Sequence, residues 1–178
     1  QTEDWSFEDA VLDDLTEEQF RRIPKNGEHS IAWCIWHLAR IEDTAMNILI
    51  ADAPQVFSQG DWQTQLDVPY RDCGNHMDSS SMIRISEQVN LQMLRDYRVA
   101  VGRRTRKIVS ELQPEDLTKK VDPLRIQRVM DEGALTEASR GIADYWSKRN
   151  YAGLLLMPAS RHNLVHLNEA LKLKKRKW

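Results

Sequence analysis

Apolar residues recur at steps of three and four along most of this chain, and such steps place side chains on one face of an α-helix. The clearest stripe lies within 31–49 and consists of Ile31, Cys34, Ile35, Leu38, Ile41, Ala45, Ile48 and Leu49. Val, Ile and Thr seldom form the alternating runs that indicate β-strands. The pattern therefore predicts an all-α protein with a strong helix that ends before Pro54.

Three further segments have the same helical spacing. They are residues 5–15, 82–112 and 136–173. The first predicts a short helix, and the second predicts the longest helix of the protein, continuous over its whole length. Pro158 interrupts the third segment, and because proline lacks an N–H we expect it to kink or restart that helix.

Residues typical of helix starts support these boundaries. Thr16–Gln19 has the pattern of a capping box, which predicts another short turn before Pro24. Ser79–Ser81 offer N-caps for the longest helix. Asp122 followed by Pro123 pairs a cap with a proline at the first helical position, so we expect a short helix that ends near Asp131.

Residues 54–78 form a long polar segment rich in helix breakers. A connection of this length is uncommon unless it crosses a bundle or shapes a site. We therefore expect a four-helix bundle with a long crossover connection, in one domain over residues 1–178. The core between facing helices is the usual place for metals and ligands in such bundles, so we expect the site there.

Charge excludes one class of partner. The formal net charge is -2, which gives no general attraction to nucleic acid, so we expect no specific nucleic-acid partner. The end of the chain is nevertheless basic, through Lys172, Lys174, Lys175, Arg176 and Lys177. Either these side chains bind phosphate or anionic lipid, or they are bases near a helix end, where the macrodipole favours them.

Other features indicate the compartment. The longest apolar stretch, residues 152–158, is far shorter than the ~20 residues of a membrane-spanning helix. Gln1–Ala10 is acidic and lacks the basic start of a signal peptide. Two cysteines, Cys34 and Cys73, do not make the disulfide framework of a small secreted protein. We expect a cytoplasmic protein with no membrane partner.

Three histidines form the pattern that points to chemistry. His162 and His166 stand four residues apart in a helical stretch, which places them on one face about 5 to 6 Å apart. His37 lies on the flank of the apolar stripe, where a lone histidine is more often a core residue hydrogen-bonded to a neighbour. Together, three neutral imidazoles match a catalytic metal site that leaves positions open for water or substrate.

Nearby residues have two interpretations each. Glu169 is a candidate catalytic group that orients water or supports a ligand, or it forms a surface ion pair with Lys172. Arg161 either holds an anionic substrate or is a solvated helical arginine. Cys34 is either a nucleophile or a small buried hydrophobic residue, and the second interpretation is favoured.

Four further residues receive no role in the site. Neither Glu42 nor Asp43 stands three or four residues from His37, so we do not expect them to ligate the same ion from its face of the helix. His29 and His76 lie in expected loops, and the sequence assigns them nothing.

Several segments resemble the DinB superfamily of four-helix metalloproteins, also called the DinB/YfiT-like group. They are His29–Glu42, Arg161–Glu169 and, at the end of that family's first helix, Leu15–Phe20. The family takes one ligand from the second helix and an H-x3-H pair from the fourth, so the resemblance implies that His37, His162 and His166 are the metal ligands. Against the family pattern, we expect a truncated first helix and an insertion at about 120–135.

The resemblance also implies an activity, because members are similar to thiol-dependent transferases and isomerases. We expect an enzyme that holds one divalent ion, Zn or Ni first, and acts on a small-molecule substrate or thiol, with a homodimer left open. The alternative is a non-catalytic, stress-associated metal-binding or scaffolding bundle. A pocket beside the ion would favour the enzyme, and histidines bonded to backbone in a filled core would favour the scaffold.

Overall fold

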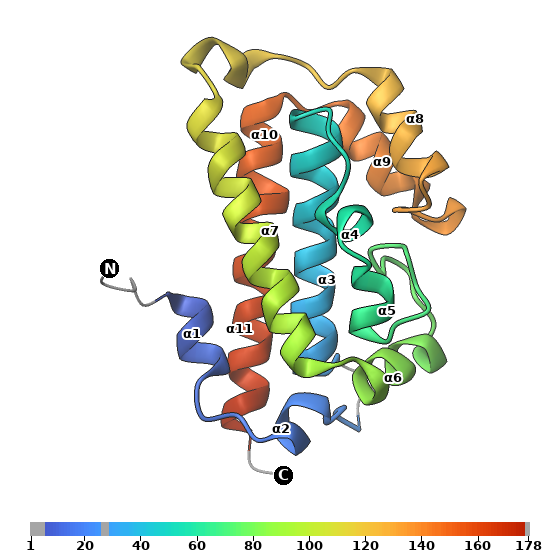
Figure 1. The fold of residues 1–178 in the computed structure, drawn as a ribbon, viewed down its shortest axis with the longest axis vertical. Helices are drawn as coiled ribbons and strands as arrows, with labels where there is room; N and C mark the ends of the chain where they lie inside the picture. The colour runs from blue at the N-terminus through green and yellow to red at the C-terminus, as the bar shows by residue number, and fades with distance from the viewer. Residues whose placement is uncertain (1–5, 26–28, 177–178) are drawn as a thin grey trace.

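The computed structural model describes residues 6–25 and 29–176 (Figure 1). This part of the chain is helical and contains no strand, and one isolated β-bridge pairs Lys120 with Asn150. The prediction of an all-α protein is confirmed. Trp5, where the first helix was expected to begin, lies outside the described residues.

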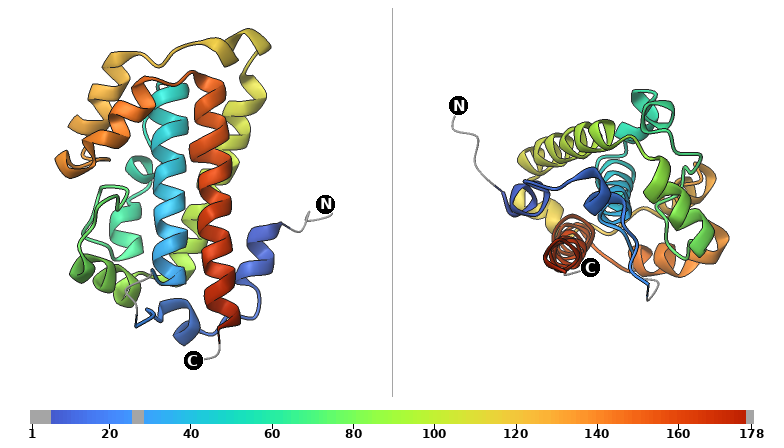
Figure 2. Two further views of the ribbon diagram at one scale, coloured as in Figure 1. Left: turned by 180° about the vertical axis from the view of Figure 1, so that it is seen from behind. Right: turned by 90° about the horizontal axis from the view of Figure 1, so that it is seen from below.

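Three long helical rods lie side by side, with the central rod in contact with the other two (Figures 1 and 2). They are α3 (Ile31–Asp43) continued by the π-helical turn η1 (Thr44–Ile50), α7 (Leu91–Glu111), and α10 (Tyr151–Leu156) continued through the π-helical turn η4 (Met157–Arg161) into α11 (His162–Lys175). The short α1 (Phe7–Leu12) packs against α11, and α2 (Glu17–Arg21) packs against α3. The arrangement is a helical bundle with a short first helix.

The central rod is buried on every side. Each residue from Ile31 to Ile50 is buried, although the sequence predicts only an apolar stripe. The crossover, residues 54–78, folds into the short helices α4 (Val56–Gln59) and α5 (Trp62–Leu66). It covers one side of the central rod. At the far end of the rod, α8 (Pro123–Asp131) packs against η1 and against α9 (Arg140–Ser147).

The expected continuous helix over 82–112 is wrong. The segment divides into α6 (Ser79–Gln88) and α7, because Val89 is extended and the side chain of Asn90 accepts hydrogen bonds from the first turn of α7. An asparagine side chain that caps a helix competes with a continuous helical backbone. The expected serine caps of α6 are also wrong, since Asp78 is the N-cap and accepts from the Ser81 amide at 3.0 Å.

The α-helical hydrogen-bond pattern of the last rod is interrupted at Pro158, where the sequence predicts a kink or a restart. The chain passes through η4 as a π-helical turn and continues directly into α11. This wider turn accommodates a residue without an N–H, and the hydroxyl of Ser160 donates to the Leu155 carbonyl at 2.8 Å. A further break, which the sequence did not predict, lies before Asn150, whose side chain accepts from the Gly153 amide and caps α10.

Two other helix starts agree with the sequence. The capping box at Thr16 is present: the Thr16 hydroxyl accepts from the Gln19 amide at 3.2 Å, and the Gln19 side-chain oxygen accepts from the Thr16 amide at 2.9 Å. Asp122 caps α8 by accepting from the Leu124 amide at 2.8 Å, and Pro123 occupies the first helical position. The first amides of a helix have no partner within the helix, and both caps supply a hydrogen-bond acceptor to such an amide.

A lysine in the basic end of the chain makes a structural contact. Lys174 lies in the last turn of α11, and its ammonium donates to the main-chain carbonyl of Ala10 at 3.1 Å and to that of Asp13. This contact ties α11 to the end of α1. Lys177 lies outside the described residues.

None of the described helices combines the length and apolar character that a lipid bilayer requires.

A buried polar cluster fixes the crossover on the central rod. The Asp43 carboxylate accepts from the amides of Val56 and Phe57 and from the Tyr97 hydroxyl, at 2.8, 2.9 and 2.7 Å. Arg40 donates to the same hydroxyl at 3.0 Å and to the main-chain carbonyl of Arg71 at 2.6 Å. Buried polar groups are stable only when they are paired, so these contacts determine where the crossover lies against α3.

We predict that Asp43→Ala lowers the free energy of unfolding by about 3–5 kcal/mol, because it leaves the buried Arg40 charge and several donors unpaired. Urea denaturation followed by circular dichroism measures the change. Asp144→Ala removes an exposed carboxylate and serves as the control, with an expected change within about 0.5 kcal/mol. Equal stability of the two variants would contradict this role.

Candidate metal centre

The structure brings His37, His162 and His166 together between α3 and α11. Their candidate ligand atoms all lie within 4.8 Å of one another. The centroids of the rings are 4.9 Å apart for His37 and His162, 4.8 Å for His37 and His166, and 4.6 Å for the α11 pair. We call these three side chains the trihistidine cluster.

The main-chain carbonyl of Cys73 orients His37. It accepts a hydrogen bond from Nδ1 of His37, and because a carbonyl only accepts, this nitrogen carries the proton. The Nε2 lone pair therefore points away from the carbonyl, toward Nε2 of His162 at 3.2 Å. The Cys73 amide in turn donates to the Ala134 carbonyl at 2.9 Å. The expected insertion at 120–135 thus supports the loop that orients His37.

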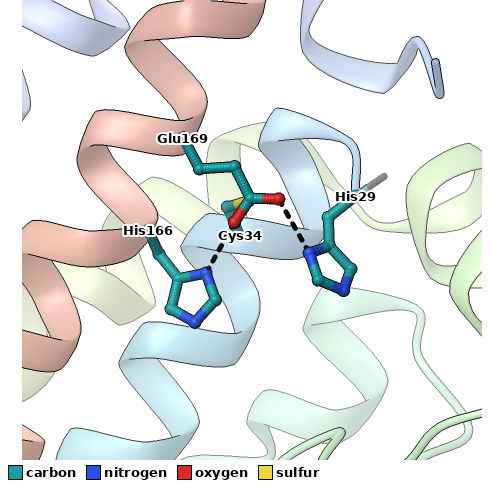
Figure 3. A group of neighbouring side chains, drawn as sticks. All are labelled: His29, Cys34, His166 and Glu169. Atoms are coloured by element: carbon teal, nitrogen blue, oxygen red, sulfur yellow. Dashed lines mark hydrogen bonds and ion pairs between the residues drawn. The ribbon is translucent and has the colours of Figure 1, made fainter. Parts of the chain in front are cut away.

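Glu169 orients His166. One carboxylate oxygen of Glu169 pairs with Nδ1 of His166 at 3.1 Å, and the other pairs with Nδ1 of His29 at 2.8 Å (Figure 3). This contact leaves Nε2 of His166 for the trihistidine cluster. A carboxylate or carbonyl on the second nitrogen of a metal-binding histidine is the usual way to fix its ring.

The electrostatics of the site favour neutral imidazoles beside an ionised carboxylate. Burial, together with the neighbouring histidines, holds the pKa of His37 well below its usual range. Burial and the proximity of His166 lower the pKa of His162 to about 4. Burial alone would raise the pKa of Glu169, but hydrogen bonds from His166 and His29 outweigh it and lower that pKa. His37 and His162 are therefore neutral at neutral pH.

The trihistidine cluster fits one divalent ion. Two nitrogens bound at about 2.1 Å to the same tetrahedral ion lie roughly 3.4 Å apart, close to the observed separation of 3.2 Å between the two Nε2 atoms. Nδ1 of His162 is buried and has no hydrogen-bond partner among the described residues, so no second contact orients that ring as Cys73 and Glu169 orient the other two. Imidazole nitrogens suit zinc, nickel, copper and iron, and three protein ligands leave a position open.

Sequence reasoning missed His29. Its ring stacks on Trp33 with centroids 3.8 Å apart, and Trp33 stacks in turn on His37 at 4.5 Å. The i, i+4, i+8 spacing of His29, Trp33 and His37 was a signal in the sequence, because it continues one helical face beyond the start of α3. The Cys73 carbonyl had no such signal, since any residue type presents one.

The other sequence candidates lie elsewhere or have structural partners. Glu42 is buried and pairs with Arg98 at 3.1 Å and with Asn163 at 2.6 Å. Arg161 and His76 are exposed. Cys34 is fully buried beside Glu169, and burial with the nearby carboxylate raises the pKa of its thiol.

A cavity of about 210 Å³ lies next to this region. Its lining includes His29, Pro24, Met82 and Ile83. Among the described residues the cavity reaches the His29 end of the stacked rings, and the trihistidine cluster does not line it.

The fold and the site together define a class of protein. It is a helical bundle with a candidate metal centre made by one histidine of the central rod and an H-x3-H pair of the last rod. A family model of the DinB superfamily matches residues 5–170. The chain belongs to the DinB superfamily, which confirms the resemblance. No curated protein matches the chain.

We predict that the metal-free protein loses stability as pH falls from about 6.5 toward 4. The pKa of His162 is about 4 in the folded state against 6.5 ordinarily, so the unfolded chain binds more protons in this range and folding becomes less favourable. The contribution of His162 is on the order of 2–3 kcal/mol. Urea denaturation at several pH values should show a smaller loss in His162→Gln.

His76→Asn is the matched control, because it removes an exposed histidine at a left-handed position that asparagine tolerates. It should keep the pH dependence of the wild type. A His162→Gln variant with an unchanged pH dependence would show that His162 is protonated equally in both states.

Proposed function

We propose that this protein is a divalent-metal-dependent enzyme that transfers a low-molecular-weight thiol to a small electrophile. In this proposal His37, His162 and His166 hold one ion, with Zn or Ni as the first candidates. The observation that carries it is the meeting of three imidazoles whose candidate ligand atoms all lie within 4.8 Å of one another. Membership of a superfamily that resembles thiol-dependent transferases supports the choice of thiol.

Two of the proposed ligands, His37 and His166, are prepared for a cation by neighbouring groups. When bound, the cation supplies Lewis-acid chemistry that favours the deprotonated form of a thiol or water near neutral pH. The Cys73 carbonyl keeps the ε-nitrogen of His37 unprotonated, and Glu169 does the same for His166. Glu169 is therefore proposed to act by positioning His166, because both of its oxygens already contact histidines.

The proposed reaction balances without a further reagent. The thiol loses its proton to solvent, its sulfur attacks an electrophilic carbon, a C–S bond forms, and the bond to the leaving group breaks with both electrons on that group. Low-molecular-weight thiols are kept reduced in the cytoplasm, which is where we propose that the enzyme works.

The alternative is a non-catalytic, stress-associated metal-binding or scaffolding bundle. Two observations favour it. His37 is bonded to backbone, and its Nε2 lies within hydrogen-bond distance of His162, so these rings satisfy each other. The cavity of about 210 Å³ reaches His29 instead of the trihistidine cluster.

An assay of thiol conjugation to an activated aryl chloride separates the two proposals. We expect saturable turnover with one of several low-molecular-weight thiols in the presence of added Zn or Ni. Turnover should disappear in His37→Ala, because loss of one of three ligands disturbs both metal affinity and geometry. In Glu169→Gln it should fall by about 10–100-fold and remain measurable, the usual cost of losing such a supporting contact.

His76→Asn again provides the control and should retain full activity. Circular dichroism of each variant establishes that it is folded. Equal rates for the wild type and His37→Ala would leave the non-catalytic bundle as the better account.

A further inference from the structure

A second group of potential ligand atoms lies on the Nδ1 side of His166. It consists of His29, Cys34, His166 and Glu169, whose candidate atoms all lie within 4.8 Å of one another. Figure 3 shows the Cys34 sulfur beside the Glu169 carboxylate, with His29 and His166 flanking that carboxylate. The four side chains come from the segment before α3, from α3 itself and from α11. None of the roles described so far uses the Cys34 thiol.

The Glu169 carboxylate divides its two oxygens between its neighbours. Oε2 pairs with Nδ1 of His166 at 3.1 Å, and Oε1 pairs with Nδ1 of His29 at 2.8 Å. On the His29 side, Oε1 and Nδ1 of His29 would exchange their mutual hydrogen bond for bonds to an ion, while Oε2 continues to orient His166. A thiolate, an imidazole and a carboxylate are the three ligand types that zinc takes in proteins.

We propose that Nδ1 of His29, Sγ of Cys34 and Oε1 of Glu169 form a second divalent-cation site, separate from the trihistidine cluster. Its ion would be zinc-like, because a sulfur ligand selects against magnesium and calcium. Binding releases the Cys34 proton to solvent. His29 then carries its own proton on Nε2, and the Nδ1 proton of His166 stays on its bond to Oε2.

Burial is consistent with this assignment. Cys34 is fully buried, where an isolated thiolate is unfavourable and an adjacent cation offsets that cost. The side chains of His29 and Glu169 are 31% and 26% exposed, which gives an ion a path from solvent. The ring of His29 is held by stacking on Trp33, so the site is largely formed before the ion arrives.

Cobalt titration of tag-free, metal-free protein tests the proposal, because a thiolate bound to Co²⁺ gives a near-ultraviolet charge-transfer band that an all-histidine site lacks. We expect the wild type to bind two Co²⁺ per chain, measured by elemental analysis after dialysis, and to show the band. Cys34→Ser should lose the band and one of the two ions. His37→Ala should keep the band and lose the other ion.

Cys73→Ser is the matched control. Cys73 is also fully buried, but its sulfur lies 3.2 Å from the Thr44 hydroxyl and outside the cluster. This variant should keep the band and both ions. Should Cys34→Ser fail to fold by circular dichroism, His29→Ala replaces it as a change at a partly exposed position, and it too should lose the band and one ion.

Three results would overturn the second site. They are a wild type without the charge-transfer band, a band that persists in Cys34→Ser or His29→Ala, and a band that Cys73→Ser abolishes. A single ion with the band, unaffected by His37→Ala, would support the second site while contradicting metal binding at the trihistidine cluster. The two proposals therefore fail in distinguishable ways.

Discussion

The complete burial of the rod formed by α3 and η1 imposes the requirement that organises the rest of the molecule. This rod contains polar side chains that water cannot reach, among them His37, Arg40 and Asp43. Each must find a partner inside the protein, since an unpaired buried polar group costs about 1–3 kcal/mol. The crossover supplies these partners as backbone groups, including the carbonyls of Arg71 and Cys73. The contacts between the crossover and the central rod therefore both stabilise the fold and orient His37.

The last rod supplies the other side chains of the site. The π-helical turn η4 carries the chain past Pro158 without ending the helix, and His162 and His166 follow it one turn apart. Glu169 then fixes His166 and reaches His29, so one ionised carboxylate links two imidazoles from different elements. The neighbouring thiol of Cys34 adds sulfur to this region. The result is a nitrogen-rich centre bordered by a mixed set of ligand types.

The sequence predicted what depends on local periodicity, such as the buried stripe of 31–49 and the cap at Asp122. Sequence-based prediction failed where tertiary contacts or backbone geometry determine the ends of helices and the partners of buried side chains. The apolar stripe of 82–112 continues across Asn90, so periodicity alone could not reveal the break that this cap creates. Pro158 was recognised as an interruption, but no spacing rule predicts the π-helical turn that carries the chain past it. His37 was found by its residue type, whereas its carbonyl partner at Cys73 has no sequence signature.

We propose that His37, His162 and His166 share one divalent ion. Diffraction from crystals grown with zinc, recorded on both sides of the zinc absorption edge, tests it most directly. The account predicts an anomalous peak at about 2.0–2.1 Å from Nε2 of each of the three histidines. Well-ordered rings with no peak between them, or zinc peaks only at other positions, would contradict it.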